Sequence, residues 1–201
     1  MSNKEFDITE CFDNLRPIFH SEADFQFELA WEIQKKYTDA KVRLEYPVEL
    51  DGTRKHIDIY VKNGNNEYFI ELKYKTKGLE IKHEGEDYTL TNQSAQNLAS
   101  YDFLKDVQKV ETLGKGYAIL LTNDTAYETR DGKDTMYNDF AVNEGREIKQ
   151  NTPYKWKDAY KENTDDSSRD KHLVFKNDYT IRWKELPNNA YHFKYCLIEV
   201  L

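Results

Sequence analysis

The segment that most restricts the fold of this chain is residues 56–75, HIDIYVKNGNNEYFIELKYK. Apolar residues alternate along both halves of the segment, which predicts two β-strands that each bury one face. Between the halves stands Asn-Gly, a dipeptide strongly favoured in tight hairpin turns. The segment therefore predicts a β-hairpin, and the strands of this hairpin contain three charged residues, Asp58, Glu71 and Lys73.

The register of the hairpin decides which of these charges meet. If the loop spans residues 63–66, Asp58 lies directly opposite Glu71; if the turn is only residues 63–64, Asp58 opposes Phe69 and Glu71 is diagonal to it. Because side chains alternate with period two, both registers leave Asp58, Glu71 and Lys73 on one face of the sheet. A solvated face on which Lys73 screens two acids is the simplest explanation. However, like charges directly opposite each other destabilise a ladder, so an Asp–Glu pair calls for a further reason.

The segments around the hairpin predict an α/β arrangement. Residues 20–37 carry a serine cap and apolar residues at i, i+4 and i+8, which predicts a helix. Residues 41–50 predict a strand whose Pro47 favours a sheet edge or a bulge. Residues 91–113 predict a second helix and residues 116–122 a buried strand. The expected order is helix, three strands, helix, strand.

We expect a single domain over residues 1–201, with a core at about 21–124 and a C-terminal extension at about 125–201. In the extension, residues 172–183 resemble a hairpin, residues 192–200 a final strand, and the polar residues 155–172 a long mobile loop.

The chain lacks the features of a membrane or secreted protein. No stretch approaches the about 18 apolar residues of a membrane span, and the first residues lack the apolar run of a signal peptide. The two cysteines, Cys11 and Cys196, fit neither a metal spacing nor a disulfide framework. We therefore expect a cytoplasmic protein with reduced thiols and no membrane partner.

The net charge of −8 argues against a protein that coats nucleic acid non-specifically, which would need a basic surface. It does not exclude a metal-dependent nuclease, because bound cations offset the acids of such a site locally. Two carboxylates beside a lysine suit a hard divalent cation.

The spacing Asp58-x12-Glu71-Leu72-Lys73, placed between two helices, resembles the motif of the PD-(D/E)xK nuclease superfamily. That superfamily includes restriction endonucleases, archaeal junction resolvases and the nuclease domains of recombination helicases. The resemblance covers about residues 21–124, and Ile57 stands where the family name has proline, at a position that is not a ligand. It implies an α/β, restriction endonuclease-like three-layer core with a central mixed β-sheet flanked by helices, followed by a β-rich C-terminal extension.

The resemblance also implies roles for the motif residues. Asp58, Glu71 and the carbonyl of Leu72 would bind Mg²⁺, with Mn²⁺ as an alternative, and Lys73 would position the attacking water and stabilise charge at the phosphate. The family often adds a glutamate from the first helix, and Glu22, near the core-facing stripe, fits better than Glu28. An acid in the first turn that complements the helix dipole explains Glu22 equally well.

Four further residues are candidates for binding nucleic acid. Gln93 and Gln96, one turn apart at the start of the second predicted helix, loosely match a glutamine motif of recombination-type relatives. Lys75 and Lys77 follow the motif and are placed to meet phosphates. Polar residues at a helix start and a solvated basic loop, which extends to Lys82 and His83, are the simpler explanations.

The function that the resemblance implies is metal-dependent hydrolysis of phosphodiester bonds, in DNA or, as the second choice, in RNA. Targeting would come from the extension, from a homodimer partner or from another protein. A nuclease-like fold used as a non-catalytic protein- or nucleic-acid-binding module remains the alternative. A carbohydrate or peptide hydrolase is a weaker third, because a nearby lysine is expected to depress the pKa of a carboxyl needed as a general acid.

Overall fold

The computed structural model describes residues 6–93, 95–133, 135, 137–157 and 172–201. Its centre is a mixed sheet of six strands in the order β1-β2-β3-β6-β10-β9, in which β3 and β6 are parallel and the other neighbours antiparallel. The expected α/β class is confirmed at this level. The strands of the central sheet are β1 (Lys41–Leu50), β2 (Thr53–Asn63), β3 (Asn66–Lys75), β6 (Gly116–Thr122), β9 (Trp183–Glu185) and β10 (Lys194–Val200).

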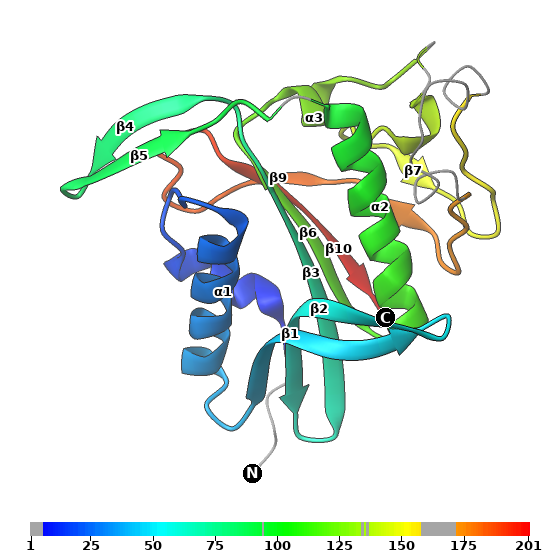
Figure 1. Ribbon diagram of the computed structural model, residues 1–201, viewed down its shortest axis with the longest axis horizontal. Coiled ribbons are helices and arrows are strands. Elements are labelled where there is room, and N and C mark those ends of the chain that lie inside the picture. Colours follow the sequence, from blue (N-terminus) through cyan, green and yellow to red (C-terminus); the bar gives the residue numbers. More distant parts are fainter. Residues whose placement is uncertain (1–5, 94, 134, 136, 158–171) are drawn as a thin grey trace.

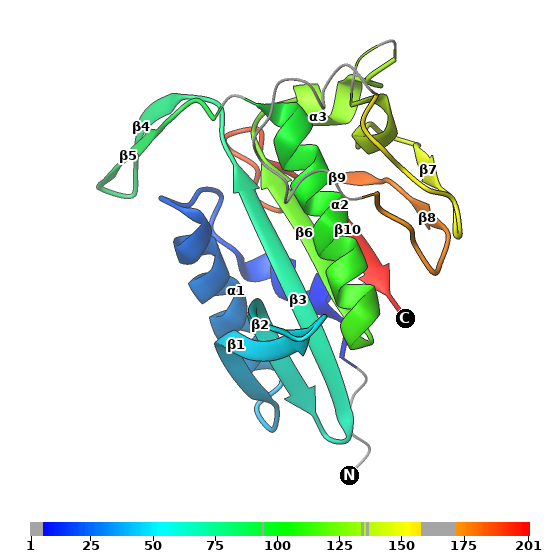
Figure 2. The same cartoon turned by 45° about the vertical axis from the view of Figure 1, so that its right-hand side comes forward.

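Helices cover both faces of this sheet (Figures 1 and 2). The helix α1 (Glu22–Lys36), with the 3-10 helix η1 (Ile8–Asn14), packs on one face, where Leu72 belongs to the core. The helix α2 (Gln96–Leu113) packs on the other face, where Leu120 belongs to a second core. Every residue of β6 is buried, as expected for a central strand with both faces covered.

The predicted hairpin forms in the longer-loop register. Lys62 pairs with Glu67, Asn63 pairs with Asn66, and the ladder ends at Ile59↔Ile70. The Asp58–Glu71 position would come next, but the two strands are no longer paired there. The structure thus selects one of the two registers that the sequence left open, but the direct cross-strand pair of acids in that register is replaced by another arrangement.

A second hairpin lies where the sequence suggested a basic loop. The strands β4 (Leu79–His83) and β5 (Glu86–Leu90) form a separate two-stranded sheet, here called the β4–β5 arm. Its turn residues Glu84 and Gly85 both have positive φ, 48° and 88°, the geometry of a tight hairpin turn. The arm extends from the end of β3 over the N-terminal end of α1 in both views (Figures 1 and 2).

The C-terminal extension completes the central sheet instead of standing apart from it. The predicted final strand is β10, which pairs with β6 along its whole length. The predicted hairpin within residues 172–183 is wrong, because β8 (Tyr179–Thr180) pairs with β7 (Glu147–Ile148) and β9 pairs with β10. Most of the predicted loop at 155–172 lies outside the described residues. Two short helices precede these strands, α3 (Ala126–Thr129) and η2 (Asn138–Phe140).

Within the described part of the chain, no helix combines the length and the apolar character that crossing a membrane requires.

Candidate functional site

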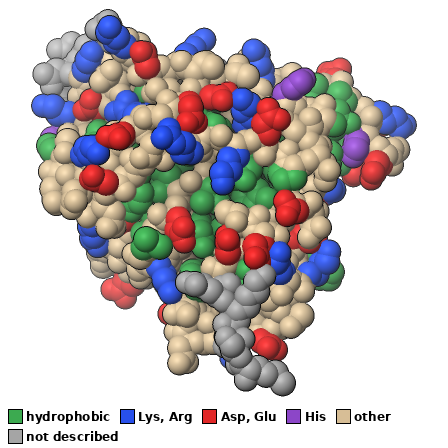
Figure 3. All heavy atoms as spheres, turned by 180° about the vertical axis from the view of Figure 1, so that it is seen from behind, with side chains coloured by type: hydrophobic (Ala, Val, Ile, Leu, Met, Phe, Trp, Pro, Cys, Tyr) green, Lys and Arg blue, Asp and Glu red, His purple; other side chains and the backbone are tan. Residues whose placement is uncertain are grey.

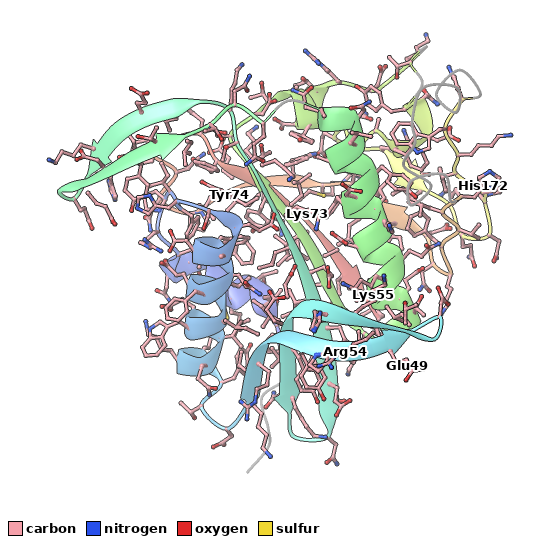
Figure 4. The ribbon with its side chains drawn as sticks, in the orientation of Figure 1. Glu49, Arg54, Lys55, Lys73, Tyr74 and His172 are labelled. Carbon is pink, nitrogen blue, oxygen red and sulfur yellow. The ribbon has the colours of Figure 1, made fainter. Side chains whose placement is uncertain are left out.

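The motif charges lie on the face of the sheet that α2 covers. Phe69 packs with the core on that side, and Glu71 and Lys73 follow it at alternate positions of β3. Figure 4 shows Lys73 on the side of β3 toward α2 and Tyr74 on the side toward α1. Asp58 lies on the neighbouring strand two residues before Tyr60, which pairs with Phe69. The alternation therefore brings Asp58, Glu71 and Lys73 to one face.

A break in the strand ladders surrounds Asp58. The β1–β2 pairing skips Glu45 and Asp58, although the pairs on either side keep one register, and Glu45 has a positive φ of 48°. The polar groups of Asp58 at this break form hydrogen bonds outside the β1–β2 ladder. The Asp58 carboxylate accepts from the Leu72 N–H at 2.6 Å, and the Asp58 carbonyl accepts from Gln26 Nε2 at 2.7 Å. Gln26 also donates to Glu45 Oε1 at 2.9 Å, so this buried α1 residue satisfies both interrupted strands.

The helix α2 contributes two charged residues that sequence reasoning missed. Lys109 Nζ donates to Glu71 Oε1 at 2.6 Å and to the His56 carbonyl at 2.6 Å. Lys73 Nζ lies 2.7 Å from Asp106 Oδ2 and donates to the Leu72 carbonyl at 3.2 Å. The available signal was weak: Asp106 stands among the inward-facing apolar residues of α2, where a charge is unusual.

Burial changes the acid–base properties of this cluster. Burial raises the pKa of Asp58 to about 6, although the Leu72 N–H and Lys73 act in the opposite direction. Burial and the charges of Asp106 and Asp58 raise the pKa of Glu71 to about 8, and Lys109 counteracts this rise. A lysine does lower the pKa of Glu71, as expected, but burial and the two carboxylates outweigh it, so the net depression is not found. Burial alone would lower the pKa of Lys73, but the charge of Asp106 outweighs it and the pKa is raised.

The two candidate glutamates of α1 have different surroundings. Glu22 Oε2 accepts from the Tyr74 N–H at 2.7 Å, and the charge of Glu22 acts on both Asp58 and Lys73. Glu28 instead accepts from the backbone N–H of Arg16 at 2.7 Å and pairs with the Arg16 guanidinium. Of the two, Glu22 is the one near the motif.

The four candidates for nucleic-acid binding lie at the same end of the sheet. Gln93 precedes α2 instead of lying on it, so the expected one-turn pair on a helix face does not form. Gln96, the first helical residue, donates to Asp124 Oδ2 at 2.6 Å. Lys75 ends β3, and the backbone N–H of Lys77 donates to Asn123 Oδ1 at 2.7 Å.

A pocket of about 370 Å³ lies between the N-terminal end of α1, the end of β3 and the β4–β5 arm. Most of the residues that line it have polar side chains. Its lining includes three of the residues predicted from the sequence, Glu22, Lys75 and Gln93. Residues from these three elements, distant in the sequence, thus share one concave surface.

The oxygen ligands expected for Mg²⁺ are of the right chemical type, since Asp58 and Glu71 offer carboxylates and Leu72 a carbonyl. Among the hydrogen bonds of the described residues, one oxygen of Asp58 and one of Glu71 accept none. The donor set therefore fits a cation held by two carboxylates and water. The described residues do not, however, include a group of three or more Asp, Glu, His or Cys side chains arranged to hold a metal. Lys109 already neutralises Glu71, so a cation would share or displace that contact.

No known protein family model, curated protein or solved structure matches this chain.

Proposed function

We propose that this protein is a metal-dependent nuclease with a restriction endonuclease-like core, acting on DNA. The observation that carries the proposal is the gathering of the buried Glu71 with the partly buried Asp58 and Lys73, at the point where β2 leaves both neighbouring strands. Removal from water strengthens the interactions between acids and a lysine and shifts their pKa values. Groups with such shifted pKa values are enriched at functional sites.

Each residue of the proposed site has a distinct role in the chemistry. Asp58 and Glu71 hold the cation, and Glu22 adds negative charge at the same end of β3. A bound Mg²⁺ supplies Lewis acidity and lowers the pKa of a coordinated water. Lys73, kept charged by Asp106, stabilises the negative charge that develops on the phosphate in the transition state. Asp106 acts as a positioning residue, because it holds the Lys73 ammonium beside the motif.

A second candidate function is supported by the ion pairs themselves. Glu71 is neutralised by Lys109 and Lys73 by Asp106, so the cluster has internal partners for most of its charge. Such a network can serve to specify the packing of α2 on the sheet. The fold would then be a non-catalytic module that binds a protein or a nucleic acid.

A cleavage assay distinguishes the two. Labelled single-stranded, duplex and branched DNA, and RNA, are incubated with the wild-type protein in Mg²⁺, in Mn²⁺ and in chelator. We expect cleavage only with metal, and a loss of about 100- to 1,000-fold in Lys73→Ala, as for removal of one electrostatic donor to a transition state. Lys184→Ala, on the exposed side of β9, is the matched control and should cleave as the wild type does.

Two results would contradict the nuclease proposal: cleavage that survives chelator, and a Lys73→Ala variant as active as Lys184→Ala. Metal binding that is lost in Asp58→Ala but kept in Lys73→Ala would separate the ligand from the charge stabiliser. A carboxyl whose pKa is raised, as that of Glu71 is, can act as a general acid in a glycoside or peptide hydrolase. Glycoside and peptide substrates are therefore included in the same assay.

A further inference from the structure

We infer that the pocket beside Glu22 binds one unpaired nucleotide adjacent to the scissile phosphate, so that the substrate is single-stranded nucleic acid. The inference rests on the proposed nuclease function and adds the strandedness of its substrate. It follows from the position, the size and the lining of the pocket.

The position links the pocket directly to the motif. Glu22 lines the pocket and accepts from the N–H of Tyr74, the residue after Lys73 on β3. Lys75, two residues further along the same strand, also lines the pocket. The charge of Glu22 also acts on Lys73, so the two side chains lie near each other although Glu22 comes from α1 and Lys73 lies on the side of β3 toward α2. A strand of nucleic acid whose phosphate lies at Lys73 would then have a neighbouring nucleotide within reach of this pocket.

The size favours one nucleotide over a duplex. A volume of about 370 Å³ is at the lower end of the range of about 300–1,000 Å³ for small-molecule sites. Such a space admits a single nucleotide but not a base pair with two backbones. Thr89 and Leu90 of the β4–β5 arm form one wall of the pocket, and the arm extends over this end of α1 (Figures 1 and 2).

The lining supplies the contacts that an unpaired base requires. His20 lines the pocket and stacks on Tyr88 with ring centroids 4.1 Å apart and planes 7° apart, and Glu86 holds its Nε2 at 3.1 Å. The His20 side chain remains 41% exposed, which leaves part of it open to contact with a base. Stacking on an aromatic ring accepts any base. The pocket lining also includes Gln93, whose side-chain amide can form hydrogen bonds with a base.

Gln93 has a further property that fits this role. Its side-chain oxygen is buried and has no hydrogen-bond partner within the described part of the chain. A buried acceptor without a partner is destabilising. A half-turn of the amide would present a donor or an acceptor to a base edge, which would give this group the partner it lacks.

The net charge of the protein favours a binding mode that does not depend on phosphate contacts alone. With a net charge of −8, phosphate contacts alone provide little affinity. Acidic and basic side chains alternate over the face drawn in Figure 3, which presents no broad basic surface there. Affinity for nucleic acid would then depend on stacking and hydrogen bonding in one defined place.

The test measures binding in chelator, so that it does not depend on cleavage. Fluorescence anisotropy of a labelled oligothymidylate and of a labelled duplex is recorded with the wild type, Thr89→Trp and Thr38→Trp. Thr89 is an exposed residue of β5 that lines the pocket, and Thr38 is an exposed residue beyond the far end of α1. Tryptophan is compatible with a strand, so Thr89→Trp should add bulk at the β5 wall of the pocket without unfolding the arm. We expect Thr89→Trp to bind the oligothymidylate about tenfold more weakly, the effect of losing one base contact, and Thr38→Trp to bind it as the wild type does.

His20→Ala, which removes the stacking ring, should weaken binding in the same direction and serves as the second variant. Equal affinity of Thr89→Trp and Thr38→Trp for the oligothymidylate would overturn the inference, as would tighter binding of the duplex by the wild type. Either result would leave the nuclease proposal intact if metal-dependent cleavage persists. Conversely, binding that follows the expected pattern without any metal-dependent cleavage would support the pocket and contradict the nuclease.

Discussion

At the scale of single residues, the contacts of the motif charges come partly from neighbours in the sequence and partly from distant ones. Local alternation placed Asp58, Glu71 and Lys73 on one face, and the register confirms the hairpin that brings them there. Alternation is a property of neighbouring residues, so it was readable from the sequence. The contacts of Glu71 with Lys109 and of Lys73 with Asp106 join residues more than thirty positions apart, through the packing of α2 on β3. No local period encodes that packing, which is why both partners were missed.

The Glu71–Lys109 contact gives the first prediction at this scale. Replacing Lys109 with methionine keeps the length of the side chain but leaves Glu71 without its cation. We expect the metal-free variant to lose about 1–3 kcal/mol in free energy of unfolding, the usual cost of a buried polar group left without its partner. Urea unfolding measures this loss, with Lys184→Met as the exposed control. A variant as stable as that control would show that the pair contributes nothing to the fold.

At the scale of elements, the strongly periodic segments were predicted and the arm was not. The helix α1 begins after the Ser21 cap, and Pro47 lies on the edge strand β1, both as expected. The β4–β5 arm was missed because its strands are five residues long and one of the apolar residues of β4, Ile81, is only half-buried. Short strands with a weak apolar pattern look like solvated loops in a sequence.

Gln26 gives the prediction at the scale of elements, because it joins α1 to the break in β1 and β2. Gln26→Met keeps the bulk and removes the donor to both the Asp58 carbonyl and Glu45. We expect a loss of about 1–3 kcal/mol in free energy of unfolding, since the buried Asp58 carbonyl is left without its donor. Gln34→Met on the same helix is the control, because its bonds to three carbonyls are longer, 3.1–3.5 Å. Equal losses in the two variants would mean that the break is held by the sheet alone.

At the scale of the whole molecule, the buried acids connect stability to pH. In the metal-free protein the pKa of Asp58 is raised to about 6 and that of Glu71 to about 8. Between the ordinary values of these carboxyls, 3.8 and 4.5, and the raised ones, the folded state binds more protons than the unfolded state. The free energy of unfolding therefore falls as the pH rises through this window.

We predict that this fall in the free energy of unfolding with rising pH depends on the ionisation of Glu71. Chemical unfolding of the metal-free wild type and of Glu71→Gln is measured from pH 4.5 to pH 8. The wild type should lose stability with rising pH relative to the variant, because the variant cannot ionise at this position. The difference between the two curves cancels the groups that they share. Parallel curves would show that Glu71 titrates near its ordinary pKa in the folded protein.

A divalent cation should reverse this loss, which supplies the last prediction. A cation that binds only the folded state stabilises it by mass action, by about 2.7 kcal/mol at a concentration 100 times its dissociation constant. We expect Mg²⁺ or Mn²⁺ to raise the melting temperature of the wild type, and to raise it more at the upper end of the pH window, where Asp58 and Glu71 are ionised. Asp58→Asn should lose this effect, whereas Asp39→Asn, at an exposed position beyond the end of α1, should retain it. Because the measurement does not involve a substrate, it separates a missing targeting partner from a missing cation site. A melting temperature that neither cation changes, in the wild type and in Asp58→Asn alike, would favour the non-catalytic module, in which Lys109 and Asp106 are the permanent partners of the motif charges.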